Sequence, residues 1–395
     1  MASSSPTGQG GALLLGKRHV INPILTRAGF LVILLFSAIP SCSKKEEGFE
    51  TRMVDGIKIV RNLAPKPEKA YRSLGFTEDI SIGEDEEAGD GLFVAPVDID
   101  SDADGNIYVL DARDAVIRLF GSQGSFIRTI GRKGQGPGEF ERPICMDVLP
   151  NGNILVVDQS LMRLTTFAEN GRFAKSSPLK EYIYDISLAK DGVLIAGYSE
   201  PQSSTDCVGT YDIETGLMTP LFSQATYWPA RSMNKELTYD FPYFVRYVLD
   251  SERRLYTGSG VAYEITAMGL DGRVEFKFSK DQARVPVQGE MLDRISNLTP
   301  KGPNPYVRDP YFPFFESLAI DERGRVWVQH YLPKISKHTY LETPYDVFSA
   351  DGVFLFETRI PGHMTAKLVF KNGYIYALKK VESGYLKAVR FKVKE

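Results

Sequence analysis

The sequence lacks an excess of either charge, since 47 Lys+Arg nearly balance 50 Asp+Glu and the formal net charge is -3. A nucleic-acid-binding surface needs clustered basic residues, so this class of function is excluded. The composition is also without the biases of disordered, collagen-like or coiled-coil chains, at 43% hydrophobic content with 35 Gly and 23 Pro in 395 residues. What remains is a globular protein that is long enough for two average domains or for one large all-β domain.

Acidic residues are absent from the first 41 positions, where the charged residues are Lys17, Arg18 and Arg27. The apolar segment Ala28–Ile39 follows, and it is shorter than the roughly 20 apolar residues of a membrane-spanning helix. A basic stretch, a short apolar run and small residues before a cleavage point are typical of a secretory signal. Its removal makes the net charge three units more negative.

Cys42 gives this signal a more specific meaning, because Ile39–Cys42 resembles the bacterial lipobox, in which the cysteine is acylated. Ser43 resembles the outer-membrane sorting pattern, and Ser43–Glu47 resembles the tether of surface-exposed lipoproteins. The alternatives are an ordinary signal peptide with an incidental cysteine and a linker that is only a solvated spacer. We expect an outer-membrane lipoprotein in the cell envelope, with Cys145 and Cys207 as buried free thiols.

An internal repeat dominates the remaining sequence, as 104–111 (DGNIYVLD) aligns with 151–158 (NGNILVVD) at an offset of 47 residues. Each unit consists of β-branched and aromatic runs separated by turn residues, which predicts four strands and no helix. We expect type I′ hairpins at Asp104-Gly105 and Asn151-Gly152. The same offset relates further pairs: Phe93 and Phe140, Pro96 and Pro143, Phe120 and Phe167, Gly124 and Gly171, and Phe126 and Phe173.

Weaker copies begin near residues 183, 244, 315 and 366, which makes six units in all. The sixth is one strand short, since Tyr385–Val393 is its third strand, whereas Thr77–Gly83 is an extra strand before the first unit. Pairing of these two segments closes a ring and removes unpaired strand edges. The sequence therefore predicts an all-β, six-bladed β-propeller over residues 77–395, after a signal peptide (1–41) and a tether with an N-terminal extension (42–76). An open solenoid is the alternative.

Three segments carry a family resemblance: Asp98–Asp111, Ile117–Phe120 and Ile130–Phe140 are similar to NHL-type six-bladed propellers. The greatest similarity is to a bacterial lipoprotein branch that is common in Bacteroidota and largely uncharacterised. The similarity is specific over residues 77–175 and loose over 180–393. It implies the fold and says little about function, because propellers host many functions.

The connections between blades and those between second and third strands open on one face of such a fold, which is where a ligand site is expected. The residues that end each second strand on that face are predicted to surround the central channel. The alternative for the two aspartates is that they accept hydrogen bonds from backbone N–H groups of nearby loops. These six positions are Asp111, Asp158, Tyr198, Ser259, His330 and Lys379.

Long insertions over Gln224–Asp240, Lys280–Pro313 and His330–Pro344 should stand on the same face. Long loops in compact domains are often functional, and aromatic residues beside basic ones suit recognition of sugars, peptides or anionic groups. A lid that merely covers the channel is the alternative. The candidates from these loops and from a glycine-rich connector are Tyr227, Trp228, Tyr331, His338 and Arg132.

Metal and catalytic motifs are weak. Asp100, Asp102, Asp104 and Asp111 have the spacing of a calcium loop, but Asp104-Gly105 is already explained as a hairpin turn. Residues 131–139 are glycine-rich but lack the ending of a phosphate-binding loop and precede a strand. His330 and His338 could share a metal, although no third ligand is specified. We expect no cofactor, with calcium or another divalent ion as the alternative.

The sequence favours a non-enzymatic binding or scaffolding lipoprotein that recognises a glycan, a peptide or an envelope protein through its loop-rich face, with a lipid anchor and no nucleic-acid partner. The second hypothesis is a metal-assisted lyase or lactone hydrolase that uses His330, His338 and carboxylates of the same face. The third is a purely structural envelope component. A bound divalent ion at the channel mouth would separate the first two hypotheses.

Overall fold

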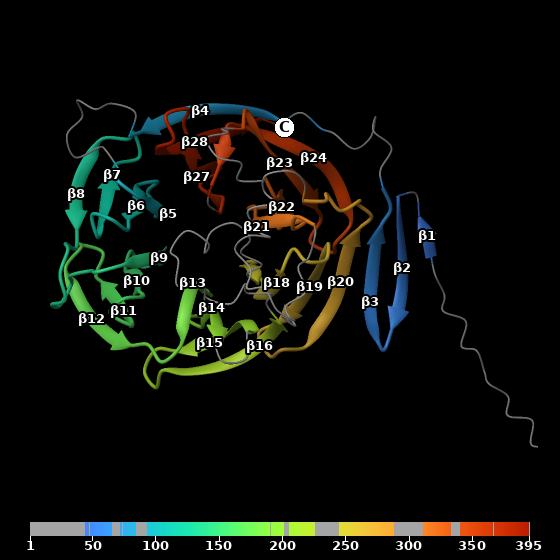
Figure 1. Cartoon of the computed structure of the whole chain (residues 1–395), viewed down its shortest axis with the longest axis horizontal. Coiled ribbons are helices and arrows are strands. Elements are labelled where there is room, and N and C mark those ends of the chain that lie inside the picture. Colours follow the sequence, from blue (N-terminus) through green and yellow to red (C-terminus); the bar gives the residue numbers. More distant parts are fainter. Residues whose placement is uncertain are drawn as a thin grey trace, which may run out of the picture. The chain divides into compact units, whose positions relative to one another are not determined.

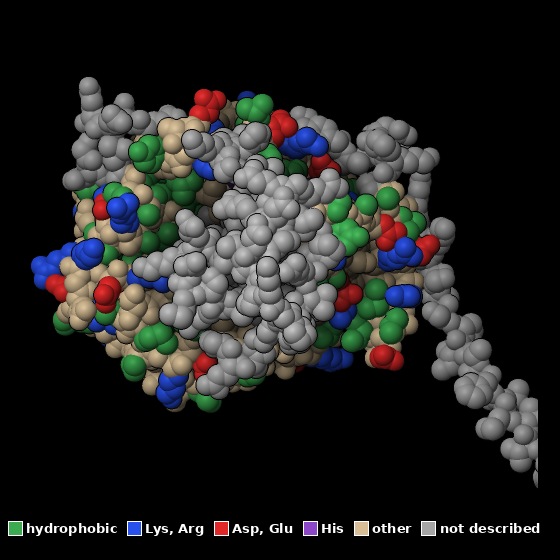
Figure 2. Space-filling view, in the orientation of Figure 1, with side chains coloured by type: hydrophobic (Ala, Val, Ile, Leu, Met, Phe, Trp, Pro, Cys, Tyr) green, Lys and Arg blue, Asp and Glu red, His purple; other side chains and the backbone are tan. Residues whose placement is uncertain are grey.

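The computed structural model describes residues 44–46, 48–64, 72, 74–83, 93–189, 191–200, 205–225, 245–287, 311–332, 340–365 and 367–394. These residues form β-strands and turns without a helix, so none of them belongs to a helix that could cross a membrane. All of them lie in the unit Ser41–Glu395. Within this unit six sheets, in which consecutive strands of each blade run antiparallel, are arranged around a centre (Figure 1). The fold is the predicted six-bladed β-propeller, and Figure 2 shows basic and acidic side chains interspersed over its described surface.

The first three blades are each built from one continuous run of chain, and the innermost strand comes first in sequence. Blade 1 contains β5 (Pro96–Ser101), β6 (Ile107–Asp111), β7 (Val116–Phe120) and β8 (Phe126–Ile130). Blade 2 contains β9 (Pro143–Val148), β10 (Ile154–Asp158), β11 (Arg163–Phe167) and β12 (Phe173–Pro178). Blade 3 contains β13 (Tyr182–Leu188), β14 (Leu194–Glu200), β15 (Thr205–Asp212) and β16 (Leu217–Ala225).

Blades 4 and 5 follow the same order, and blade 4 gains three strands from the N-terminal region. Blade 4 contains β17 (Arg246–Leu249), β18 (Arg254–Gly258), β19 (Glu264–Gly269) and β20 (Val274–Lys280). Its outer edge pairs in parallel with β3 (Ile57–Asn62), which continues to β2 (Phe49–Val54) and β1 (Lys44–Glu46). Blade 5 contains β21 (Phe315–Ile320), β22 (Val326–His330), β23 (Glu342–Phe348) and β24 (Phe354–Pro361).

Blade 6 joins the two ends of the propeller. It contains β25 (His363–Met364), β26 (Val369–Lys371), β27 (Tyr374–Lys380) and β28 (Leu386–Lys394). Its outermost strand is β4 (Gly75–Ile82), which pairs antiparallel with β28. Arg390 strengthens this closure by a two-pronged contact with Asp79, at 3.1 and 2.9 Å. The prediction that the extra N-terminal strand completes the last blade is confirmed.

Apolar side chains fill the spaces between neighbouring blades, one cluster for each of the six interfaces. The second strands of the blades are consequently buried on both faces, as in β6 and β10, where all five residues are buried. Continuous apolar runs such as Ile107–Leu110 are the sequence pattern that this double burial requires. The packing between blades therefore holds the ring together and fixes where each innermost strand lies.

The turn type at the repeated hairpins was predicted wrongly. Gly105 and Gly152 have φ of 79° and 78°, but Asp104 and Asn151 do not have the positive φ that a type I′ turn requires. The N–H of Gly105 instead donates to the carbonyl of Asp102, which closes a type I turn followed by glycine in the left-handed region. A type I′ pair does occur in blade 6, where Asn372 and Gly373 have φ of 57° and 75°.

The N-terminal strands are docked against the propeller. Val60 is fully buried in the apolar cluster between blades 4 and 5. The amide of Asn62 donates to the carbonyls of Ser279 and Gly352 and accepts from the N–H of Phe354. The segment 49–62, which the sequence assigned to the tether and extension, thus adds to a blade, while the predicted boundaries at 41/42 and 76/77 stay predictions.

Candidate functional site

Six positions, one in each blade, surround the centre of the propeller. Each lies near the start of an innermost strand. On the neighbouring second strand it faces the residue immediately before the predicted rim position, as Asp98 faces Leu110 and Cys145 faces Val157. The equivalent pairs in the other blades are Asp185 with Gly197, Arg246 with Gly258, Ser317 with Gln329 and Thr365 with Leu378. We call Asp98, Cys145, Asp185, Arg246, Ser317 and Thr365 the ring positions.

Irregular pairing precedes four of the ring positions. The registers of β5, β9, β13 and β21 each skip one residue, namely Val97, Ile144, Tyr184 and Glu316. Such a β-bulge re-aims side chains and is common beside functional sites. In blade 6 the innermost strand is broken between β25 and β26, and the N–H of Thr365, just after β25, donates to the carbonyl of Leu378. The innermost strand is therefore distorted beside the ring position in most blades.

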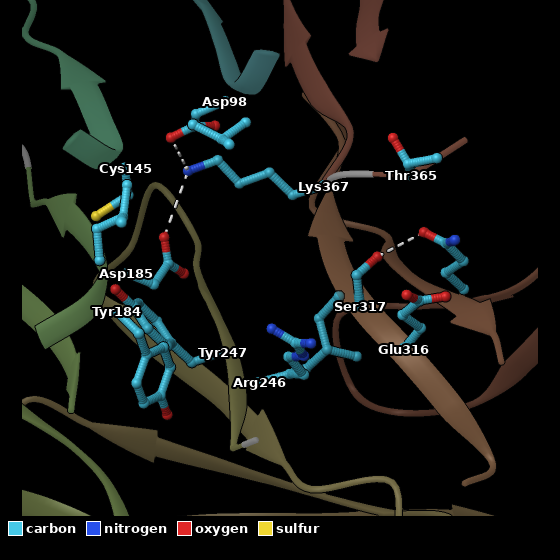
Figure 3. Close-up of a pocket in the computed structure, with 14 residues that line it drawn as sticks. Asp98, Cys145, Tyr184, Asp185, Arg246, Tyr247, Glu316, Ser317, Thr365 and Lys367 are labelled. Carbon is cyan, nitrogen blue, oxygen red and sulfur yellow. Dashed lines mark hydrogen bonds and ion pairs between the residues drawn. The ribbon is translucent and has the colours of Figure 1, made fainter. Parts of the chain in front are cut away.

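The ring positions line a cavity of about 220 Å³ to which all six blades contribute (Figure 3). Its wall also includes the four bulged residues, Lys367 from the broken strand, and Tyr247, Leu318 and Gln329. The lining mixes carboxylates, cations, hydroxyl groups and apolar side chains. Because the blades are otherwise repeats of one unit, this chemical variety at equivalent positions is typical of a binding site rather than of a structural channel.

Carboxylates gather on the side of blades 1 to 3, and lysines of blade 6 reach them. Nζ of Lys367 lies 3.6 Å from Oδ2 of Asp98 and 3.6 Å from Oδ1 of Asp185. Figure 3 shows this side chain extending from its own blade across to the other two. Nearby, Nζ of Lys371 lies 2.7 Å from Oδ1 of Asp100. One irregular blade thus supplies the positive charges for the three regular blades.

The same carboxylates also link neighbouring innermost strands. Asp98 accepts the backbone N–H of Met146 at 2.9 Å, and Asp100 accepts that of Val148 at 2.8 Å. One blade further, Asp147 accepts the N–H of Leu188 at 2.6 Å. Innermost strands of adjacent blades are not paired into one sheet, so these side chains satisfy N–H groups that would otherwise lack a partner. They fix the acidic side of the cavity in place.

Burial perturbs the protonation of this group. It raises the pKa of Asp98 to about 6, against the opposing effect of Lys367. Burial and the charge of Asp100 raise the pKa of Asp147 to about 7. For Lys367, burial alone would lower the pKa, but the surrounding aspartates, Asp98 first, hold it well above its ordinary value. The lysine is therefore charged at neutral pH, and part of the acidic cluster holds protons there.

The opposite side of the cavity carries Arg246, Glu316 and Ser317 (Figure 3). The hydroxyl of Ser317 donates to Oε1 of Gln329 at 2.8 Å, and the amide of Gln329 donates to the carbonyl of Met364 at 3.2 Å. Tyr184 donates to the carbonyl of Val245 at 3.0 Å, which ties the wall of blade 3 to that of blade 4. These bonds hold the polar wall between blades 4, 5 and 6.

Asp111 and Asp158, two of the predicted rim residues, are fully buried beneath their loops. Asp111 accepts the N–H groups of Val94, Ala95, Arg113 and Asp114. Asp158 accepts those of Glu141, Arg142 and Leu161. Both carboxylates therefore have the loop-capping role that the sequence offered as the alternative.

The other predicted rim residues have local partners as well. Tyr198 is buried in the cluster between blades 2 and 3, and its pKa is raised by burial and by Cys207. Ser259 is buried and accepts the N–H of Val261 at 3.4 Å. Lys379 lies 2.8 Å from Glu78 of β4, across the closing sheet. Their role in ligand binding stays a prediction.

Tyr331, which is buried, stacks on Phe312 with 5.7 Å between ring centroids. Arg132 is exposed and pairs with Glu139 in the glycine-rich connector. Cys42, Tyr227, Trp228 and His338 lie outside the described residues. Among the described residues predicted as sites from the sequence, none lines the cavity.

His330 belongs to a different cluster in blade 5. Its Nε2 lies 3.0 Å from Oδ2 of Asp346, and ligand atoms of His330, Asp346 and Glu357 lie within 4.8 Å of one another. This is a geometry that a divalent ion could use. However, Asp346 also contacts Lys280 at 2.6 Å and the hydroxyl of Tyr263. Its oxygens therefore already have strong partners.

The calcium-type spacing near residue 100 does not form a ligand set of that kind. Asp102 accepts the N–H groups of Asp104 and Asn106, the amide of Asn106 and the hydroxyl of Tyr108. Asp100 points to Lys371 and Asp111 to its own loop. These contacts use the carboxylates to shape the hairpin. The expectation of no cofactor stays a prediction.

Comparison with known proteins agrees with the architecture. The DUF5128 family, described as a 6-bladed beta-propeller, matches residues 93–219. No curated protein matches the chain. Fold and site together define the class of the protein: it is a six-bladed β-propeller with a polar central cavity.

Several solved structures are similar. A protein of Bacteroides fragilis NCTC 9343 named as exported is 14% identical, with a TM-score of 0.54, and the match covers 85% of this chain and 100% of that one. A duf4221 family member of Bacteroides vulgatus is 13% identical, with a TM-score of 0.55 and coverage of 82% and 99%. A catalytically inactive virginiamycin B lyase of Staphylococcus aureus, with quinupristin, is 12% identical and covers 87% and 88%, but its TM-score is 0.43.

Identities this low show the fold alone. The name of the B. fragilis protein is consistent with an envelope location. The TM-score of the lyase is too low to carry an argument about activity.

The ring positions were missed in the sequence because the prediction counted along the second strands. A usable signal was present: Pro96 and Pro143 begin the innermost strands of the first two blades, and Asp98 and Cys145 each stand two residues later. The bulge shifts which side chain faces inward, and a strictly alternating pattern cannot reveal it. Counting from the start of the first strand would have found these two positions.

Proposed function

We propose that this protein is a non-enzymatic binding propeller of the NHL type, anchored to the outer membrane through Cys42, and that its central cavity receives a polar ligand or the polar end of a larger one. The observation that carries the proposal is the set of ring positions, which places six side chains of five residue types around one cavity at the face where the blades are connected. A glycan, a peptide or an envelope protein would present such a group.

The chemistry of the described lining favours binding over catalysis. Lys367 is held in its charged form, so it is a poor nucleophile. Burial raises the pKa of the Cys145 thiol well above its ordinary value, which leaves little thiolate. Asp98 is committed to backbone N–H groups of β5 and β9. Groups that are held in fixed positions and are poor nucleophiles support recognition by hydrogen bonds and charge.

A cavity-filling substitution tests the binding site. We expect Ser317→Trp to abolish binding of any ligand that raises the melting temperature of residues 43–395, because the indole would occupy the cavity. The matched control is Ser176→Trp on the exposed strand β12, which should bind normally. The assay is a thermal-shift screen of sugars, amino acids and short peptides, followed by calorimetry. Equal shifts in both variants would place the binding site elsewhere.

Where Ser317→Trp fails to fold, Thr365→Trp fills the cavity from another blade and serves the same test. The anchor has its own experiment, since Cys42→Ser should move the protein from the membrane to the soluble fraction and remove labelling by a fatty-acid probe. Retention of the label would reject the lipid anchor.

The metal-assisted lyase or lactone hydrolase is the second candidate, favoured by the grouping of His330, Asp346 and Glu357. Calorimetry with Zn²⁺ and Mn²⁺ tests it. Binding that His330→Ala abolishes would support this function. The bonds from Lys280 and Tyr263 to Asp346 lead us to expect no such binding.

A further inference from the structure

The two sides of the cavity differ in their charged groups. Blade 1 contributes Asp98 and blade 4 contributes Arg246 at equivalent ring positions, and blades three apart in a ring of six stand opposite each other. Figure 3 shows Asp98, Asp185 and the ammonium of Lys367 on one side of the cavity, and Arg246, Glu316 and Ser317 on the other. A ligand that spans the cavity would meet the carboxylates of Asp98 and Asp185 at one end and, at the other, the guanidinium of Arg246 with the carboxylate of Glu316 on the same side.

Positive charge is in deficit on the acidic side. Asp98, Asp100, Asp147 and Asp185 all act on Lys367, and the second lysine, Lys371, contacts Asp100. Four carboxylates therefore face two ammonium groups among the described residues. A cationic group entering from solvent would restore the balance, because opposite charges within about 4–6 Å stabilise one another.

The contacts of Lys367 leave room for such a group. Its ammonium is 3.6 Å from each of Asp98 and Asp185, whereas a charge-assisted hydrogen bond is about 2.7–2.9 Å long. Asp185 keeps 31% of its side chain exposed, and Oδ1 takes one backbone N–H, that of Ile186. Among the described residues no donor reaches its Oδ2. This carboxylate is thus able to accept hydrogen bonds from a ligand.

We infer that the cavity binds a compact zwitterion, a free α-amino acid, with the ligand ammonium at Asp185 and Asp98 and the ligand carboxylate at Arg246. The inference rests on the proposed binding function and names its ligand class. The hydroxyls of Ser317 and Thr365, which donate to Gln329 and to the carbonyl of Leu378, belong to residues that line the cavity, and their oxygens can accept hydrogen bonds from a ligand. Arg246 carries a planar guanidinium, the group that best matches the geometry of a carboxylate. A volume of about 220 Å³ accommodates a small amino acid.

Calorimetry with three probes of similar size tests the inference on residues 43–395. L-alanine carries both charges, ethylamine carries the ammonium alone and propionate carries the carboxylate alone. We expect alanine to bind at least tenfold more tightly than either of the others. Equal affinity of ethylamine and alanine, or no binding of alanine at millimolar concentration, would overturn the inference.

Two substitutions should give a crossed pattern. Asp185→Asn should weaken alanine binding at least tenfold while leaving propionate unchanged, and Arg246→Gln should weaken alanine similarly while leaving ethylamine unchanged. Arg246→Lys, which keeps the charge, should recover part of the alanine affinity and covers the case in which Arg246→Gln does not fold. Equal losses for all three probes in both variants would contradict the assigned ends of the ligand.

The same measurements separate this inference from the proposed function. A sugar that binds, fails to bind to Ser317→Trp and is unaffected by alanine would overturn the amino-acid assignment while leaving the cavity as the binding site. Failure of every probe in the thermal-shift screen would contradict both.

Discussion

Blades 1 and 2 differ from blade 6 in how the chain builds them, and the difference explains the chemistry at the centre. The first two blades are continuous repeats at an offset of 47 residues, with the same hydrogen bonds in their hairpins. Blade 6 takes its outer strand from the N-terminal region, has a broken innermost strand and uses a type I′ turn. A closing blade is free to depart from the repeat.

The departure of blade 6 from the repeat supplies positive charges that the described residues of the repeated blades lack at the centre. Repeating a unit places like residues at like positions, so Asp100 in blade 1 recurs as Asp147 in blade 2. Adjacent carboxylates repel one another, which is one reason that protons are held there at neutral pH. Lys367 and Lys371 come from the irregular blade and offset this charge. The regular blades thus create an acidic surface, and the lysines of blade 6 reduce the repulsion between its carboxylates.

Removing the closing strand should have the largest effect. A chain that lacks residues 43–82 loses β4, which exposes the apolar cluster between blades 6 and 1 and leaves β28 without its partner. We expect loss of a cooperative unfolding transition in denaturant. The comparison is deletion of residues 43–64, which removes β1 to β3 but keeps the ring and should leave a single, weaker transition. Similar behaviour of the two deletions would show that closure is not decisive.

Lys367→Met removes the ion pairs that join blade 6 to Asp98 and Asp185 of the regular blades. Leaving buried carboxylates without their cation costs about 3 kcal/mol, reduced here because the lysine side chain is 32% exposed. We expect the free energy of unfolding to fall by about 2 kcal/mol at pH 8. The control is Lys392→Met, whose lysine is 54% exposed beside Asp79. A loss of stability no greater than that of the control would show that Lys367 does not stabilise the carboxylates of blades 1 to 3.

The acidic cluster should make stability depend on pH. The pKa values of Asp98 and Asp147 are about 6 and 7 in the folded protein and about 3.9 when unfolded. As pH falls from 8 to 5, the folded state therefore takes up protons that the unfolded state does not, and the protein becomes more stable. We expect a gain on the order of 2 kcal/mol, measured by denaturant unfolding across this range.

The double variant Asp98→Asn with Asp147→Asn should flatten that dependence. Glu78, whose burial is outweighed by Lys379 and Lys387, has a lowered pKa and affects stability only at more acidic pH. A profile that declines from pH 8 to pH 5 would contradict the assignment.

The smallest effects should come from the loop caps of the regular blades. Asp111→Asn and Asp158→Asn each weaken several hydrogen bonds to backbone N–H groups. Losses of about 1 kcal/mol are expected from the energies of such bonds. Asp111 also pairs with Arg118 at 3.2 Å, so its variant should be slightly the less stable of the two. Unfolding midpoints in urea measure both, and a large difference would mean that the two repeats are not energetically alike.

The fold could be predicted from the sequence because its signals are local and repeated. The turn glycines mark hairpins, the apolar runs mark second strands, and the extra segment near Thr77 marks the strand that closes the ring. The number of repeated units gives the number of blades, six. The docking of β3 against β20 could not be predicted in this way, because it joins residues more than 200 positions apart by backbone hydrogen bonds. Pairing of that kind leaves little trace in side-chain patterns.

The candidate site was harder to predict than the fold. Asp111 and Asp158 were found because they repeat, and repetition marked a structural role. Arg246, Ser317 and Thr365 occupy equivalent positions but share no residue type, so self-similarity could not align them. Lys367 lies where the strand is broken, and its approach to Asp98 and Asp185 depends on ring closure. The candidate site is therefore lined by residues that differ from one repeat to the next.

The most direct test of the central claim is an anomalous difference map from crystals of residues 43–395 soaked with the selenium-containing amino acid selenomethionine. The account predicts a selenium peak within the cavity, with the ligand backbone between Asp185 and Arg246. A peak at another surface, or an empty cavity at a concentration that saturates binding in solution, would contradict it.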